Sequence, residues 1–291
     1  SSAGSLREAL NPADLGSAKH REAALQTAEE SITLLKNTTT ANGTPLLPLG
    51  NQPLFVFGSA ADDLNLLNGA WTNTWQGSDS QYRHNPLYPT IWEALIKNHA
   101  QALSSNTRTA KQLKILKKLL APNAAAIFCI GETPGTEIPG NIDDLAAEIN
   151  AGDKQLFDFF VQNQVPVVLV MATGRPRIIT EYANKSTAVL QAYLPGNEGG
   201  TAIANIMYGV TNPSGKLPYT YPRFAGDVVH YDHKSTEKND KLFGTNAYQP
   251  LFDFGSGLSY TQFGYTNLLV SPSKDQGFQV STTITNTGKV A

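Results

Sequence analysis

The stretch AAAIFCIGE, residues 124–132, decides the fold of this chain. An unbroken apolar run that contains isoleucine and phenylalanine and stops at a glycine is typical of a strand buried on both faces, as in a parallel sheet. Cys129 lies inside this run and is the single cysteine of the chain, so an internal disulfide is impossible. We therefore expect Cys129 to be a small buried hydrophobic residue.

Three more runs share this character: they are short, apolar, rich in β-branched or aromatic residues, and end in glycine or proline turns. They are PLFVFGS (53–59), VPVVLVMATG (165–174) and TAVLQAYLPG (187–196). Other segments have helical length and spacing. These are SAKHREAALQTAEESITLLKN (17–37), expected to be one long amphipathic helix, PTIWEALIKNHAQAL (89–103), IDDLAAEINAGDKQLFDFFVQN (142–163) and NEGGTAIANIMYG (197–209).

Strands that alternate with helices predict an α/β layer sandwich with a mostly parallel sheet. In such sheets, ligands bind beyond the carboxyl ends of the strands. A functional site is therefore expected on the loops after Phe57, Ile130, Met171 and Tyr193.

Composition narrows the function classes. The chain has 291 residues, 41% of them hydrophobic, and a formal charge of −2 from 22 Lys and Arg against 24 Asp and Glu. Without a long basic block it is not expected to bind nucleic acid. No apolar run approaches the roughly 20 residues that a membrane-spanning helix needs. The N-terminal residues lack the apolar centre of a signal peptide, which leaves the compartment open.

Neither a metal nor a cofactor is expected. His230 and His233 are close in sequence but have no cysteine or third histidine nearby. The segment GVTNPSGKL approaches a phosphate-binding loop, yet it has five residues between Gly209 and Gly215, and Leu217 stands where Ser or Thr would hold Mg²⁺. A serine-hydrolase elbow, G-x-S-x-G, is also missing from the sequence.

Two tryptophans share one predicted loop, NGAWTNTWQG (68–77), after the strand LFVFG. Trp71 either packs into the core, as large aromatic residues commonly do, or lines a ligand site. Trp75 lies between Thr74 and Gln76 and is expected to be exposed toward a ligand. A flat indole beside amide donors suits a sugar ring, which has apolar C–H faces and a polar rim.

Two carboxylates lie in a second predicted loop, IGETPGTEIPGN (130–141). Glu132 follows the strand directly, whereas Glu137 lies further out between glycine and proline turns. Loop acids are usually solvated surface residues. Their position at a strand end, with a tryptophan-bearing loop at another strand end, favours a functional role.

Several segments together resemble glycoside hydrolase family 3, of the β-glucosidase and exo-β-glucan glucohydrolase type, from about residue 20 to 265. The segments are ESITLLKN, NGAWTNTWQG, IGETPGTE, YLPGNEGGTAIANIMYGVTNPSGKLPYTYP and FDFGSGLSY. The resemblance implies an N-terminal barrel with an aspartate nucleophile, followed by a six-stranded, mostly parallel sheet in an α/β/α sandwich. This chain corresponds to the sandwich, and no barrel or nucleophile lies within it.

The resemblance also implies a division of the chain. Residues 1–16 are expected to be a linker from the barrel domain, 17–265 the α/β sandwich domain, and 266–291 the start of a truncated fibronectin-III-like β-sandwich domain. The alternating pattern of FQVSTTITNTG (278–288) independently predicts a half-buried strand in that last part.

Site roles are implied residue by residue. The family pattern G-E-x-x-x-x-E matches Gly131, Glu132 and Glu137, and its second glutamate is the general acid/base. Trp75 matches the tryptophan that stacks on the sugar in the +1 subsite, and Trp71 and Glu132 are expected to contribute to substrate binding. Glu132 is also expected to anchor the loop. Ala70 departs from the family's Gly-Gly-Trp sequence at this position.

The implied activity is removal of glucose from β-glucosides or β-gluco-oligosaccharides with retention of configuration, in the periplasm or outside the cell. The barrel domain is the implied partner, and this chain alone is expected to be inactive. A β-xylosidase or N-acetylglucosaminidase of the same family is an alternative. A non-catalytic carbohydrate-binding α/β domain is another.

Overall fold

The computed structural model describes residues 15–96, 100–103, 106–227, 248–273 and 277–290. Its core is a six-stranded sheet with the order β1-β6-β5-β4-β2-β3, parallel except for β1. The predicted sheet is therefore confirmed. The strands are β1 (Thr33–Asn37), β2 (Leu54–Phe57), β3 (Ala100–Ala102), β4 (Ala125–Gly131), β5 (Val167–Ala172) and β6 (Ala188–Gln191).

Strand β4 shows why these apolar runs form the centre of the sheet. All of its residues are buried, and successive side chains enter two different cores. Ile127 and Cys129 pack on one face, while Phe128 and Ile130 pack on the other. The buried Cys129 is as predicted, and burial raises the pKa of its thiol.

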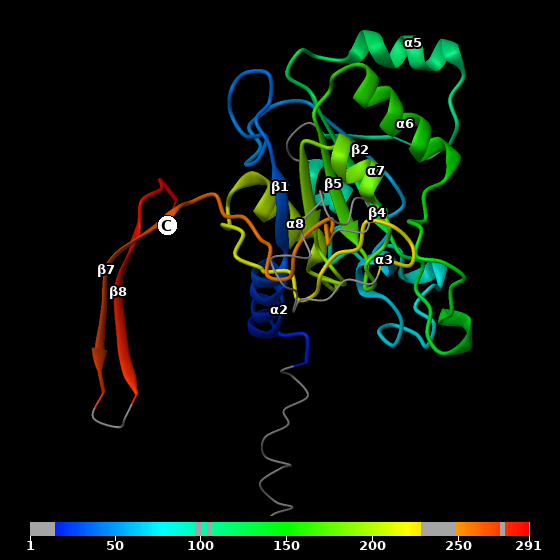
Figure 1. Ribbon diagram of the computed structural model, residues 1–291. Coiled ribbons are helices and arrows are strands. Elements are labelled where there is room, and N and C mark those ends of the chain that lie inside the picture. The colour runs from blue at the N-terminus through cyan, green and yellow to red at the C-terminus, as the bar shows by residue number, and fades with distance from the viewer. Residues whose placement is uncertain (1–14, 97–99, 104–105, 228–247, 274–276, 291) are drawn as a thin grey trace, which may run out of the picture.

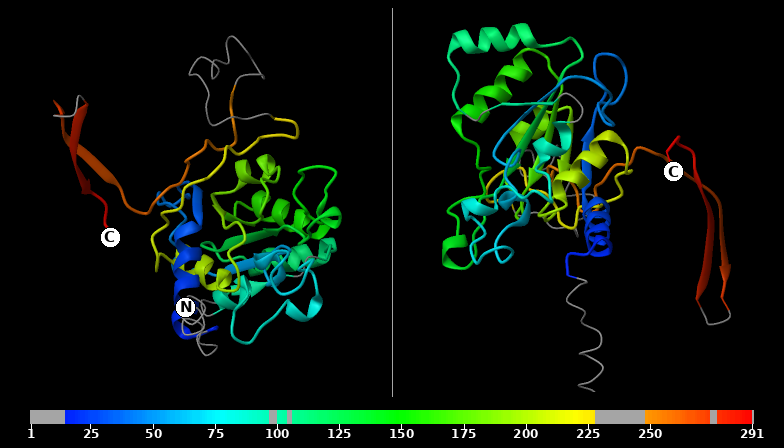
Figure 2. Two further views of the ribbon diagram at one scale, coloured as in Figure 1. Left: turned by 90° about the horizontal axis from the view of Figure 1, so that it is seen from below. Right: turned by 180° about the vertical axis from the view of Figure 1, so that it is seen from behind.

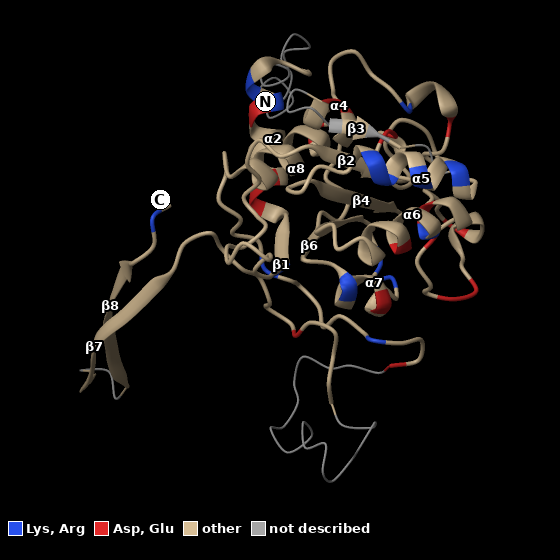
Figure 3. Cartoon of the chain, turned by 90° about the horizontal axis from the view of Figure 1, so that it is seen from above, with Lys and Arg blue, Asp and Glu red and all other residues tan. Residues whose placement is uncertain are grey.

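Helices cover both faces of the sheet, which makes the fold an α/β/α sandwich (Figure 1). One core contains residues of α2, α3, α4 and α8, and the other contains residues of α5, α6 and α7. The bounds are α2 (Ala18–Ser31), α3 (Asn65–Asn68), α4 (Ile91–Leu95), α5 (Ala110–Leu119), α6 (Ala151–Gln162), α7 (Thr180–Lys185) and α8 (Gly199–Tyr208). In Figure 3, α5 lies at the edge of the molecule with its lysines in blue.

The prediction of one helix over residues 17–37 is wrong in its last part. Helix α2 ends at Ser31, Ile32 is extended, and the next residues form β1 antiparallel to β6. The physical reason is two-sided burial: Leu34 enters one core and Leu35 the other, which requires the alternation of a strand. Pairing with β6 therefore overrides the helical pattern.

The segment 89–103 also divides into two elements. Its helix α4 covers only Ile91–Leu95, where a capping box between Thr90 and Glu93 defines its start. Strand β3 then adds to the edge of the sheet beside β2. Sheet pairing again decides the structure of a segment whose sequence favours a helix.

The remaining helical segments differ in how well they were predicted. In the segment 142–163 only Ala151–Gln162 is α-helical, because Asn150 caps the helix by accepting a hydrogen bond from the Asp153 N–H. Helix α8 is as predicted for residues 197–209.

No helix among the described residues is long and apolar enough to cross a membrane.

The C-terminal part forms a hairpin of β7 (Phe263–Pro272) and β8 (Phe278–Asn286). The strand predicted at residues 278–288 is confirmed, but its predicted half-burial is wrong, because all residues of β8 are exposed. The hairpin stands apart from the sandwich (Figures 1 and 2). Its residues are almost all exposed, including Tyr265, Leu269 and Phe278. A two-stranded hairpin standing alone is marginally stable at best.

Candidate functional site

The loops that follow β2, β4, β5 and β6 meet at the carboxyl edge of the sheet, as the strand pattern predicted. They line a cavity of about 350 Å³. Its walls comprise Gly69 and Ala70 after β2, residues 132–137 and Gly140 after β4, Gly174 and Arg175 after β5, and Leu194 after β6. The loop with two tryptophans and the loop with two glutamates are therefore neighbours in space.

Glu137 lies at the tip of its loop, exposed, and lines this cavity. Its backbone has φ 54° and ψ −143°, a conformation that costs a non-glycine residue about 1–3 kcal/mol. A short 3₁₀ turn, Ile138–Gly140, follows it. Within the described part of the chain, its carboxylate has neither a hydrogen bond nor an ion pair. Strained backbone of this kind is concentrated at functional sites, which makes Glu137 a candidate.

Glu132 has the opposite environment and is only 7% exposed. Its Oε2 accepts hydrogen bonds from the backbone N–H of Gly174 at 3.0 Å and of Arg175 at 3.1 Å. Its Oε1 forms an ion pair with the Arg175 guanidinium. Glu132 thus anchors the β4 loop to the β5 loop, as expected. Its contact with a sugar stays a prediction.

The sequence does not reveal the contacts that the basic residues make in this network. Arg175 Nη1 donates to the Gly140 carbonyl at 2.9 Å, so one side chain holds both the start and the end of the Glu137 loop. The buried Arg177 forms an ion pair with Glu148, whose carboxylate also accepts from the Thr133 N–H. The only available signal was the pair of arginines in GRPR directly after a buried strand.

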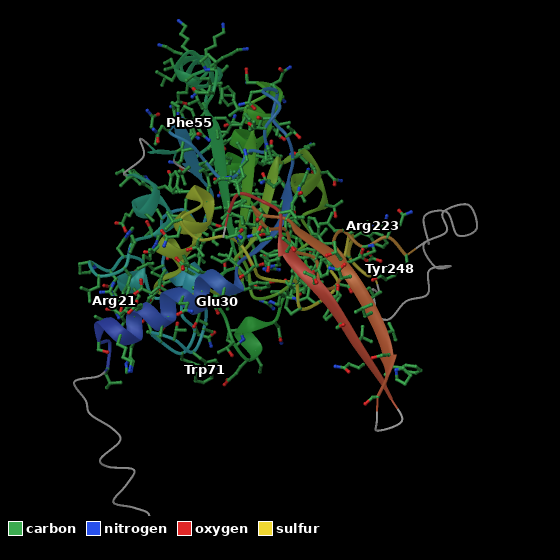
Figure 4. All side chains as sticks on the ribbon, turned by 90° about the vertical axis from the view of Figure 1, so that its left-hand side faces the viewer. Arg21, Glu30, Phe55, Trp71, Arg223 and Tyr248 are labelled. Atoms are coloured by element: carbon green, nitrogen blue, oxygen red, sulfur yellow. The ribbon has the colours of Figure 1, made fainter. Side chains whose placement is uncertain are left out.

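Trp71 is 65% exposed and Trp75 is 52% exposed, so the core alternative for Trp71 is wrong. The loop folds back on itself tightly: a side chain at Gly77 would lie 2.3 Å from the Gly69 carbonyl oxygen. Such a closed loop has no interior for an indole, and both rings turn outward. Figure 4 shows Trp71 at the end of the molecule opposite Phe55.

The two indoles lie close together, with ring centroids 6.3 Å apart and planes inclined by 55°. The backbone N–H of Trp71 donates to the Trp75 carbonyl at 3.1 Å, which closes the turn between them. Neither indole is among the residues that line the cavity, but Trp71 Nε1 donates to the hydroxyl of Thr136, the residue before Glu137, at 2.7 Å. The pair of exposed indoles is therefore an apolar platform next to the loop that carries the free carboxylate. This combination can bind a sugar ring and transfer a proton to it.

A second, larger cavity of about 900 Å³ adjoins the first and shares Thr133 and Pro134 with it. Within it, Asp63 forms an ion pair with Arg83 at 2.8 Å. Burial raises the pKa of the Asp63 carboxyl, while the Asn65 backbone N–H and the Arg83 guanidinium lower it. Asp63 and Arg83 thus bind each other, and we assign no catalytic or binding role to this second cavity.

One grouping of possible metal ligands exists among the described residues: Asp62, His84 and Glu93, all exposed. Thr90 already engages both carboxylates, because its hydroxyl donates to Asp62 and its N–H donates to Glu93, each at 2.8 Å. The grouping is therefore part of the start of α4. His230 and His233 lie outside the described residues.

The six-stranded sheet and the loops at its carboxyl edge define the class of this chain: an α/β sandwich domain with a candidate site on its strand-end loops. Residues 32–260 match the model of the Glycosyl hydrolase family 3 C-terminal domain. The chain belongs to this family.

Curated relatives include a lysosomal beta glucosidase of Dictyostelium discoideum, 36% identical over 95% of this chain and 35% of the relative. A periplasmic beta-glucosidase of Salmonella typhimurium is 28% identical over 93% of this chain and 39% of the relative. Among solved structures, beta-glucosidase from Listeria innocua in complex with glucose shares the fold with a TM-score of 0.75 and 23% identity. That match covers 94% of this chain and 38% of the solved chain. The chain thus spans little more than a third of these proteins.

Proposed function

We propose that this chain is the acid/base-bearing domain of a retaining, exo-acting β-glucosidase or β-glucan glucohydrolase. The observation that carries the proposal is Glu137: an exposed carboxylate without a partner among the described residues, in a strained turn, on the wall of a cavity beside two exposed indoles. Glucosidase names among relatives that match nearly the whole chain support it.

Retaining hydrolysis requires two carboxyl groups about 5–5.5 Å apart. One attacks the anomeric carbon. The other protonates the leaving oxygen and later takes a proton from water. In this proposal Glu137 is the second group, and the nucleophile is an aspartate of an N-terminal barrel domain. The division of the chain at residues 16 and 265 belongs to the same proposal, although the second boundary falls three residues inside β7, which begins at Phe263.

Trp75, in this proposal, stacks on the leaving sugar, and Trp71 and Glu132 contribute to the same subsite. A β-glucoside or β-gluco-oligosaccharide is the substrate class, and no metal takes part. The relatives' names include a lysosomal and a periplasmic enzyme, which favours a secreted or periplasmic location for this protein as well.

The experiment compares Glu137→Ala with the parent in the complete enzyme that contains this chain, using two β-glucosides. A general acid contributes about 10²–10⁴-fold to the rate. We expect a loss of that size in kcat/KM for a poor leaving group such as methanol. We expect a much smaller loss in the glycosylation rate for 2,4-dinitrophenol, which departs without a proton. Glu22→Gln on the exposed face of α2 is the control and should leave both rates unchanged.

A binding role for Glu137 predicts a different result. In a non-catalytic carbohydrate-binding domain, removal of the carboxylate raises KM for both substrates and leaves kcat unchanged. That outcome would refute the acid/base assignment. Rates on aryl β-glucosides, β-xylosides and N-acetyl-β-glucosaminides separate the proposed glucosidase from a xylosidase or an N-acetylglucosaminidase.

A further inference from the structure

Thr136 directly precedes Glu137, and all of its polar groups are bonded to the tryptophan loop, residues 69–77. Its hydroxyl accepts from Trp71 Nε1 at 2.7 Å. Its backbone N–H donates to Gln76 Oε1 at 3.0 Å, and its carbonyl accepts from Gln76 Nε2 at 3.4 Å. The tryptophan loop therefore holds the residue next to the proposed proton donor at three points.

The Gln76 amide bonds the Thr136 backbone as a neighbouring strand would. It pairs with the N–H of Thr136 and, over the longer distance, with its C=O, which also accepts from the Gly140 N–H at 3.1 Å. Gln76 therefore restrains the peptide plane before Thr136 and shares the restraint of the plane after it. The second of these planes is the peptide bond to Glu137. Its orientation helps to determine where the Glu137 side chain points from its φ 54° backbone.

The other end of the turn is held by a different group, because Arg175 Nη1 bonds the Gly140 carbonyl. Glu137 thus lies between two fixed points while its own carboxylate stays free. Gln76 is half-buried and follows Trp75 directly. We call its two hydrogen bonds to the Thr136 backbone the clasp. The proposed sugar platform and the clasp therefore belong to one short segment.

We infer that Gln76 is a positioning residue for Glu137: its amide holds Thr136 so that the carboxylate meets the leaving oxygen beside the Trp75 platform. This inference rests on the proposed function. Misplacement of a reacting group by about 1 Å can cost about 10²-fold in rate. Loss of the clasp should therefore lower the step that needs the proton and leave substrate binding nearly intact.

The test uses Gln76→Ala and Gln76→Glu in the complete enzyme. For Gln76→Ala we expect kcat/KM on a glucoside with a poor leaving group to fall about 10–10²-fold. On 2,4-dinitrophenyl glucoside kcat/KM, which reports glycosylation alone, should change less than about 3-fold, because that leaving group needs no proton. Gln76→Glu keeps an acceptor for the Thr136 N–H and should retain most of the activity.

Gln112→Ala is the matched control. Gln112 Oε1 accepts from the Thr109 backbone N–H at 2.8 Å, the same type of contact, but at the start of α5. This variant should keep the parent rate on both substrates.

Amide hydrogen exchange supplies a readout that does not depend on activity. In Gln76→Ala the Thr136 amide loses its acceptor, so the loop of residues 133–141 should exchange faster than in the parent and in Gln112→Ala. Unchanged exchange would overturn the clasp. Equal losses on both substrates would overturn the positioning role, since they would indicate general damage.

Glu137→Ala separates the two hypotheses. If it behaves as the loss of an acid while Gln76→Ala keeps full activity on the poor leaving group, only the positioning role fails. If Glu137→Ala keeps full activity on that substrate, the proposed function fails and the positioning role fails with it.

Discussion

At the residue scale, two glutamates five positions apart have opposite tasks because their surroundings differ. Glu132 is buried among backbone N–H donors and Arg175, and Glu137 is exposed with a free carboxylate. A buried carboxylate needs such partners, because desolvation without them is costly. Glu132 therefore stabilises the loop from which Glu137 projects.

Removal of Glu132 should destabilise the domain. Glu132→Ala leaves the guanidinium of Arg175 without its ion pair and removes the carboxylate 3.7 Å from the buried Arg177. The Gly174 and Arg175 backbone N–H groups also lose their acceptor, and an unsatisfied donor of this kind costs about 1–3 kcal/mol in the free energy of unfolding. Urea unfolding measures it. Glu181→Ala removes an exposed pair with Lys185 and should change stability by no more than about 0.5 kcal/mol. Similar effects of the two variants would contradict the anchoring role.

The residues of the site were only partly predictable from sequence, for a physical reason. The strand-end loops that carry Glu137 and Trp75 could be predicted from the sequence, while the roles of these two residues are implied by the family resemblance and stay predictions. Gln76 and Arg175 could not, because their roles depend on which loops become neighbours across the sheet. The position of Trp71 could not be predicted, because an indole can pack in a hydrophobic core or stack on a sugar. Only the closed conformation of the loop shows that the indole is not in the core.

At the element scale, central and edge strands differ in how clearly their sequences define them. Strands β2, β4, β5 and β6 are continuous apolar runs, so their burial could be predicted. Edge strands β1 and β3 have polar or alanine-rich sequences that also suit a helix, and only pairing with β6 and β2 fixes their structure. Element type was therefore predictable where the whole strand is one continuous apolar run.

Helix α8 gives an element-scale prediction. Its first turn packs so closely on the segment before α4 that a side chain at Gly200 would lie 2.2 Å from the Pro89 carbonyl oxygen. Since backbone cannot move aside easily, we expect Gly200→Ala to lower the free energy of unfolding by about 1–3 kcal/mol or more. Gly277→Ala, where no atom of the described residues lies within 4 Å of the added Cβ, is the control and should be nearly neutral. Thermal or urea unfolding of both variants measures the two changes. An unchanged free energy of unfolding in Gly200→Ala would contradict this close packing.

At the scale of the whole molecule, the candidate site is an open edge. The indoles of Trp71 and Trp75 and the Glu137 carboxylate face outward from the sandwich, and the described residues supply no second acid assigned to catalysis. Retaining hydrolysis needs a pair of carboxyl groups, so the proposed pair is divided between two domains. Activity then depends on how those domains pack.

This chain produced alone should fold without hydrolysing glucosides. Its two cores are contained within the sandwich, which predicts a cooperative unfolding transition and a circular dichroism spectrum of a mixed α/β protein. Without a nucleophile, turnover of an aryl β-glucoside should be undetectable. Turnover comparable to that of an intact enzyme would refute the division of the catalytic pair.

The most direct test of the central claim, that Glu137 is the general acid/base, is the product that Glu137→Ala forms with azide in the complete enzyme. A retaining enzyme without its acid/base still forms a glycosyl-enzyme intermediate from an activated glucoside, and azide attacks it without needing a base. We predict restored turnover and a glucosyl azide of β configuration. An α-glucosyl azide would instead make Glu137 the nucleophile, and the absence of any glucosyl azide with full hydrolysis retained would contradict a catalytic role for Glu137.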